Sequence, residues 1–270
     1  MTIPKKIHWC WLSGDPLPEM LHDCVKSWKR VMPDYEIVLW DMNRFDIHSA
    51  KYVEDACAVR KWAFAADYIR LYALYTEGGI YLDADVMVYR RFDNLLNCVM
   101  FSGAVKLPAK IKLSDNSVLI PDWYIEAEII GAEKNHPFIK ACLESYKTKV
   151  FQINEYGKVL CETIPDAITR VAYEQFGLNP FASIKQAQIL DMGIVIHPPA
   201  VLGTTWHAVN MKTYAAHLCM DSWGKTKQKS SLKKMYERFC AKYRLIAMLH
   251  IFRKNIFRKM KFEKQIKINK

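Results

Sequence analysis

One short apolar run constrains the fold of this chain more than any other segment. It begins with two glycines and ends in two acidic residues that are spaced by one residue. Residues 78–86 read GGIYLDADV, so Asp83 and Asp85 follow the apolar segment. The run predicts a buried strand, and the glycines predict the end of a preceding helix. Carboxylates at the end of such a strand lie at the crevice where open α/β sheets bind ligands. Because Mg²⁺ and Mn²⁺ prefer carboxylate and phosphate oxygens, the pattern indicates a site for a cation and a diphosphate, although alone it is equally typical of a solvated turn.

The segment before this strand has the pattern of a packed helix. Within residues 60–75, apolar side chains at 62, 65, 66, 69 and 73 recur at helical spacing. Asp67 and Arg70 lie three residues apart and therefore share one face of the helix. Alone, the pair is typical of an ordinary surface salt bridge. On a helix that leads to Asp83, both side chains can also reach the same pocket.

Together these motifs resemble the donor-site core of glycosyltransferases with a sugar-binding Asp-x-Asp region, in particular the capsular-polysaccharide and fungal enzymes of glycosyltransferase family 32. Residues 3–14 and 33–41 resemble the two opening strands of this family. The resemblance extends over residues 3–223. One departure is residues 161–165, CETIP, where many relatives carry Thr-Gly-Pro.

The resemblance implies a role for each matching residue at the donor site. Asp67 and Arg70 would be the catalytic pair that orients the donor sugar. Trp11 would stack on the nucleobase, although a tryptophan after an apolar strand is also typical of a core residue. Ser222 and Trp223 would bind the nucleotide sugar by donating hydrogen bonds to the departing diphosphate.

The same resemblance implies a metal site. Asp85 would bind Mn²⁺ or Mg²⁺ directly, and Asp83 would contact both the cation and hydroxyl groups of the nucleotide sugar. His217 would be a further metal or phosphate ligand, although a lone histidine is more often a satisfied polar residue.

The expected function is therefore metal-dependent transfer of a hexose from a nucleotide diphosphate sugar, with UDP favoured as the nucleotide. The resemblance further implies retention of anomeric configuration. The expected acceptor is a glycan, in particular a lipid-linked oligosaccharide of bacterial capsular or cell-surface polysaccharide synthesis. One alternative is a haloacid-dehalogenase-like phosphatase, in which Asp83 would be the nucleophile, but that class carries the motif on its first strand.

Charge provides the second alternative, a basic nucleic-acid-binding protein, because the formal net charge is +11. This charge is concentrated at the C-terminus: residues 224–270 hold sixteen basic and two acidic residues, or +14, which leaves −3 for the rest. The mildly acidic remainder argues against a nucleic-acid partner. Lys and Arg alternate with apolar residues in 224–270, a pattern that predicts an amphipathic helix on an anionic membrane surface, or else a helix packed on the domain.

Length and composition predict one α/β domain, residues 1–223, and a basic helical tail, residues 224–270. The resemblance implies a GT-A-type nucleotide-binding, Rossmann-like fold with a mainly parallel sheet flanked by helices. Eight scattered cysteines without a Cys-x-x-Cys motif, and no signal-peptide pattern, predict a cytoplasmic protein, and the basic tail predicts its location at the inner face of the membrane. The expected strands are 6–11, 35–40, 80–88, 99–105 and 189–196, and the expected helices are 18–31, 53–75, 137–150 and 165–176.

Overall fold

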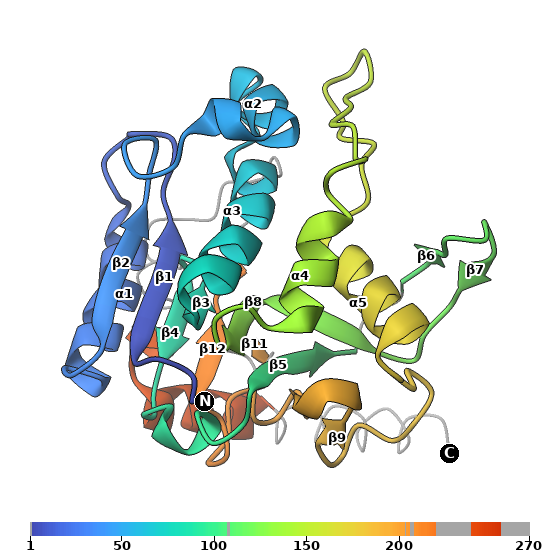
Figure 1. Cartoon of the computed structure of the whole chain (residues 1–270). Coiled ribbons are helices and arrows are strands. Elements are labelled where there is room, and N and C mark those ends of the chain that lie inside the picture. The colour runs from blue at the N-terminus through green and yellow to red at the C-terminus, as the bar shows by residue number, and fades with distance from the viewer. Residues whose placement is uncertain (1, 107–108, 203, 206–207, 220–238, 255–270) are drawn as a thin grey trace, which may run out of the picture.

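A seven-stranded sheet with helices on both faces forms the centre of the molecule (Figure 1). The computed structural model describes residues 2–106, 109–202, 204–205, 208–219 and 239–254. The strand order is β2 (Glu36–Trp40), β1 (Lys6–Cys10), β3 (Gly79–Leu82), β8 (Tyr124–Ala132), β5 (Met100–Val105), β10 (Ile194–His197) and β9 (Gln188–Ile189). Only β8 and β9 run against the other five strands. The expected α/β class with a mainly parallel sheet and flanking helices is confirmed.

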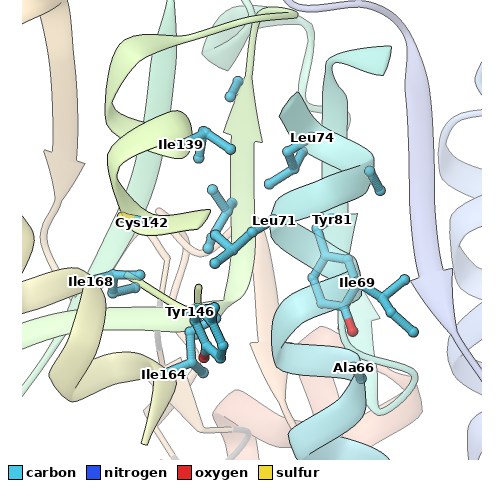
Figure 2. Packing of buried hydrophobic residues seen from close by; sticks show 14 of the residues in the cluster. Ala66, Ile69, Leu71, Leu74, Tyr81, Ile139, Cys142, Tyr146, Ile164 and Ile168 are labelled. Carbon is cyan, nitrogen blue, oxygen red and sulfur yellow. The ribbon is translucent and has the colours of Figure 1, made fainter. Parts of the chain in front are cut away.

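Four helices cover one face of the sheet: α2 (Lys51–Ala58), α3 (Trp62–Glu77), α4 (Pro137–Glu144) and α5 (Ile164–Gln175). Figure 2 shows how their apolar side chains meet, with Leu71 and Leu74 of α3 facing Ile139 of α4. These three side chains are fully buried, so this layer fixes α3 firmly against the sheet.

The other face of the sheet carries α1 (Glu19–Val31) and a small sheet of β11 (Thr204–Thr205), β12 (Ala215–His217) and β4 (Val86–Val88). Trp28 of α1 is fully buried, and its indole nitrogen donates a hydrogen bond to the Val86 carbonyl at 2.8 Å. The Val88 amide donates to the Ser27 hydroxyl at 3.0 Å. Helix α1 therefore holds in place the strand that follows Asp85.

Several element boundaries differ from those expected from the sequence. The expected strand 80–88 is two strands, β3 and β4, which belong to different sheets. The expected helix 53–75 divides into α2 and α3 at Arg60, whose φ is +57°. The expected helix 137–150 ends at Glu144. Strand β8 was not expected at all, because its nine residues follow no simple alternation and its central pairing is visible only in the folded chain.

Shorter elements complete the described chain: the pair β6 (Ile111–Lys112) and β7 (Val118–Leu119), and the 3₁₀ turns η1 (Ile47–Ser49), η2 (Asp93–Leu95) and η3 (Asp191–Gly193).

The two glycines where α3 passes into β3 have the conformations that the sequence suggests. Gly78 ends α3 with φ +68°, and Gly79 has φ +114°. A Cβ at Gly79 would lie 2.7 Å from the Lys6 carbonyl oxygen, so a larger residue does not fit where β3 joins β1.

The described part of the basic tail, residues 239–254, packs on the domain. Helical stretches cover 239–242 and 244–254, and Cys240 and Ala247 are fully buried in the core beside α1. The Tyr89 hydroxyl donates a hydrogen bond to the Ala241 carbonyl at 2.6 Å, and Lys242 lies 3.5 Å from Asp23. Among the helices that the structure describes, none combines the length and the apolar character needed to cross a bilayer.

Candidate functional site

The Asp-x-Asp motif forms a tight turn where the chain passes from the large sheet to the small one. The Val86 amide donates a hydrogen bond to the Asp83 carbonyl at 3.0 Å. The Asp83 amide donates to the Glu128 carbonyl of β8, and the Leu218 amide donates to the Asp85 carbonyl, each at 3.0 Å. Backbone contacts to β8 and to the end of β12 therefore fix both carboxylates.

Asp83, Asp85 and His217 form a cluster that matches the metal ligands expected from the sequence. One ligand atom of each lies within 4.8 Å of the others. His217 reaches the turn because β12 pairs antiparallel with β4 and places His217 opposite Val86. Its Nε2 lies 3.2 Å from Asp85 Oδ1. Two carboxylates and an imidazole suit Mn²⁺, and the carboxylates suit Mg²⁺, so the side chains present fit a divalent cation.

Glu128 is a fourth polar member of this cluster, which the sequence reasoning missed. Its Oε1 lies 3.2 Å from His217 Nδ1. Burial alone would raise the pKa of Glu128, but the charge of His217 and its hydrogen bond lower this pKa to about 2. Burial alone would lower the pKa of His217, but Glu128 and Asp85 hold it well above its ordinary value. The carboxylates around His217 therefore favour its protonated form, and a bound cation would compete with that proton.

Asp67 and Arg70 lie on α3 and are almost completely buried, with 4% and 3% of their surface exposed. Arg70 Nη2 donates a hydrogen bond to Asp67 Oδ1 at 2.8 Å. Its Nη1 donates to the Ala127 carbonyl at 2.7 Å and lies 3.3 Å from Asp83 Oδ1. The pair is thus no surface salt bridge, and it connects α3 directly to the Asp-x-Asp turn.

The electrostatics of this pair are unusual for an aspartate beside an arginine. Burial raises the pKa of Asp67 to about 7, because desolvation of the carboxylate exceeds the attraction of Arg70. Tyr81 supports the same group: its ring lies 4.5 Å from the Arg70 guanidinium carbon, and its hydroxyl donates to Asp83 Oδ1 at 3.0 Å. A strongly perturbed carboxyl group in such a network is typical of a functional site.

Trp11 lies at the same edge of the sheet as the Asp-x-Asp turn, because β1 and β3 are parallel neighbours and Trp11 and Asp83 directly follow them. The side chain is half-buried, and its indole nitrogen donates a hydrogen bond to the Asp15 carbonyl at 2.7 Å. Its stacking role stays a prediction. Ser222 and Trp223 lie outside the described residues.

Glu126 is a second carboxylate of β8 that sequence reasoning missed. It is 1% exposed, and neither oxygen has a hydrogen-bond partner among the described residues. Burial, and then the charge of Glu128, raise its pKa well above the ordinary value. The signal in the sequence was two glutamates spaced by one residue in an apolar run, which repeats the spacing of the Asp-x-Asp motif.

Comparisons with known proteins agree with the site. Residues 18–100 match the family model described as the glycosyltransferase sugar-binding region containing a DXD motif. The chain is 32% identical over 142 residues to inositol phosphoceramide mannosyltransferase 3 of Schizosaccharomyces pombe. The aligned region covers 51% of this chain and 35% of that protein. It is 38% identical over 90 residues to glucan organizing enzyme 1 of Cryptococcus neoformans. This aligned region covers 33% of this chain and 23% of that protein. The chain thus spans about a third or less of these two relatives.

Among solved structures, a glycosyltransferase involved in the glycosylation of the major capsid of PBCV-1 matches with a TM-score of 0.46 and 11% identity, over 87% of this chain and 98% of that one. The sequence match covers α1 through β3 and both acidic residues of the motif. Residues 18–100 are therefore similar to a glycosyltransferase sugar-binding region with a DXD motif, and the resemblance to glycosyltransferase family 32 is confirmed.

Proposed function

We propose that this chain is a metal-dependent, retaining glycosyltransferase that moves a hexose from a nucleotide diphosphate sugar, with UDP as the favoured nucleotide. The observation that carries this proposal is the contact between two polar groups: the cluster of Asp83, Asp85 and His217, and the buried pair of Asp67 and Arg70. The cluster suits a cation and a diphosphate, and the pair suits the hydroxyl groups of a sugar.

The residues divide the work as follows. A Mn²⁺ or Mg²⁺ ion held by the cluster would neutralise the negative charge of the diphosphate as it leaves. Arg70 fixes the Asp67 carboxylate, so that this carboxylate accepts hydrogen bonds from the donor sugar in one orientation. Tyr81 and Arg70 hold Asp83 from the side of the sheet.

Retention of configuration is compatible with this division. Retention needs no general base beside the acceptor, because the leaving phosphate oxygen can take the acceptor proton on the same face of the sugar. Asp67 and Arg70 then serve only to orient the hexose.

We further propose that the acceptor is a glycan on a lipid carrier in bacterial capsular or cell-surface polysaccharide synthesis. The resemblance to capsular enzymes supports this setting, and one relative is named as a mannosyltransferase of a phosphorylated ceramide, which is itself a lipid. Leu245, Leu249 and Phe252 also support it, since they are spaced as on one helix face and are each at least 65% exposed. Beside the +14 charge of residues 224–270, this apolar stripe suits an anionic membrane at the inner face of the cell membrane.

A thermal-shift screen of UDP-, GDP- and CDP-sugars with and without Mn²⁺ tests the donor assignment. A ligand at a hundred times its dissociation constant adds about 2.7 kcal/mol to the free energy of unfolding. We expect one nucleotide class to raise the melting temperature, and only with the cation present. The transferase should then release the nucleoside diphosphate slowly without an acceptor. Release of phosphate from simple monoesters would instead favour the phosphatase alternative.

A further inference from the structure

Two hydroxyls near Asp67, those of Tyr52 and Tyr146, are buried without a hydrogen-bond partner among the described residues. Both tyrosines are 3% exposed, and their rings pack edge to face with centroids 4.9 Å apart. Lys149 Nζ lies 4.1 Å from the ring centroid of Tyr146. Buried polar groups in folded proteins almost always have partners, so two such hydroxyls in one place indicate a ligand that supplies their partners.

These groups lie at the same end of the sheet as the candidate site. Figure 2 shows the hydroxyls of Tyr81 and Tyr146 pointing to the same end of the layer, where Ala66 precedes Asp67. The Tyr81 hydroxyl is the one that contacts Asp83, which identifies this end as the Asp-x-Asp end. Burial and then the charge of Asp67 raise the pKa of Tyr52 and Tyr146, consistent with hydroxyls that face this carboxylate.

The segment 161–165, which departs from the family pattern, contacts Lys149. Glu162 belongs to this segment, and its Oε2 lies 3.1 Å from Lys149 Nζ. Arg170 of α5 donates to the two oxygens of Glu162 at 2.9 and 3.1 Å. The connection between α4 and α5 extends to the end of the molecule that holds α2 (Figure 1). Glu162 thereby holds Lys149 over Tyr146 in this chain.

We propose that Tyr52, Tyr146 and Lys149 donate hydrogen bonds to hydroxyl groups of the transferred hexose and so complete the donor-sugar subsite that Asp67 and Arg70 begin. Sugar hydroxyls both donate and accept; Asp67 offers an acceptor carboxylate, the two tyrosine hydroxyls can donate, and the Lys149 ammonium keeps further N–H donors beside its bond to Glu162. We assign these groups to the donor hexose rather than to the acceptor, because Arg70 contacts both Asp67 and Asp83. Asp83 belongs to the cluster that suits the cation and the diphosphate of the donor. This inference rests on the proposed function and deepens it.

Removal of one hydroxyl at a time tests the subsite. Tyr52→Phe and Tyr146→Phe keep the rings, and neither should lower the melting temperature of the ligand-free protein, because each deleted hydroxyl lacks a protein partner among the described residues. Calorimetric titrations with Mn²⁺ would compare UDP-glucose, UDP-galactose and GDP-mannose with free UDP and GDP. We expect each variant to bind the preferred sugar nucleotide about threefold to tenfold more weakly, with unchanged affinity for the free diphosphate.

Tyr68→Phe is the matched control. Its ring also contacts Tyr146, at a centroid distance of 5.9 Å, but the side chains that shift the pKa of its hydroxyl are Tyr72, Lys147 and Glu144 rather than Asp67. It should leave both affinities unchanged. An equal loss of affinity for the sugar nucleotide and for the free diphosphate, or a drop in melting temperature, would overturn the subsite. If the wild type binds none of the three sugar nucleotides, the proposed function fails, and the subsite fails with it.

Discussion

Replacement of Asp67 by asparagine should stabilise the folded protein at alkaline pH while it removes activity. Burial raises the pKa of Asp67 from 3.8 to about 7. A raised carboxyl pKa means that the folded state holds a proton that the unfolded state releases, so stability falls as pH rises from about 4 to about 7. Three pKa units at about 1.36 kcal/mol each set this loss at about 4 kcal/mol. An asparagine side chain would keep the hydrogen-bond acceptor for Arg70 without the charge.

Urea denaturation of the wild type and Asp67→Asn at several pH values between about 4.5 and about 8 measures this effect. We expect the stability of the variant relative to the wild type to increase by about 3 kcal/mol between the two ends of the range, since unfolded Asp67 is already largely ionised at the acidic end. Other titrating groups cancel in this comparison. A difference that does not change with pH would mean that Arg70 fully offsets the burial of an ionised Asp67, and the reasoning would be refuted.

Three further predictions concern the cation, the nucleobase and the membrane. Asp85→Asn should abolish cation-dependent stabilisation and turnover. The affinity of the wild type for Mn²⁺ should weaken as pH falls, because the raised pKa of His217 favours its protonated form, which competes with the cation. Full activity of the wild type in EDTA would contradict this prediction. Trp11→Ala should weaken binding of the free nucleoside diphosphate by about 1–3 kcal/mol in calorimetry through lost stacking, and an unchanged affinity would assign Trp11 to packing. Leu249→Ser with Phe252→Ser should reduce flotation with anionic vesicles at low salt without a change in melting temperature, because both side chains are exposed; Ile189→Ser, on the exposed edge strand, is the control.

The packing of residues 239–254 changes how the tail should be tested. Removal of everything after Trp223 would expose the core that Cys240 and Ala247 cover, so a loss of function would not separate chemistry from folding. Substitutions on the exposed stripe avoid this problem. The tail thus has one face that the structure accounts for by packing, and a second, apolar face whose membrane role remains a prediction.

Sequence reasoning was most successful where local pattern decides structure. The glycines before β3, the helical spacing around Asp67 and the apolar run before Asp83 predicted an end of a helix, a helix and a strand, and all three are present. The strand β8 and its Glu126 and Glu128 were missed. The position of β8 depends on its antiparallel pairing with β3 and β5, and neither strand is adjacent to β8 along the chain. Such pairing has no local signature.

The cluster around His217 also depends on a contact between residues that lie far apart in the sequence. The sequence separation from Asp85 to His217 is 132 residues, and only the family resemblance connected them. The structure explains the connection through the small sheet, in which β12 pairs with β4 immediately after the Asp-x-Asp turn. The break of the expected strand 80–88 into β3 and β4 is therefore what allows this chain to bring His217 to the carboxylates.

Arg70 lies between two carboxylates of the site, Asp67 of the buried pair and Asp83 of the cation cluster. Its guanidinium contacts Asp67, lies 3.3 Å from Asp83 and stacks on the ring of Tyr81, while the Ala127 carbonyl fixes its orientation. A lysine cannot reproduce this arrangement, because an ammonium is a point charge and lacks the planar fork that donates in several fixed directions. Since Asp83 also belongs to the cation cluster, Arg70 and a bound cation would both stabilise its ionised form. A cation bound at the cluster would offset the charge of Asp83, which helps to raise the pKa of Asp67, and would therefore favour the ionised form of Asp67 that accepts hydrogen bonds from a sugar.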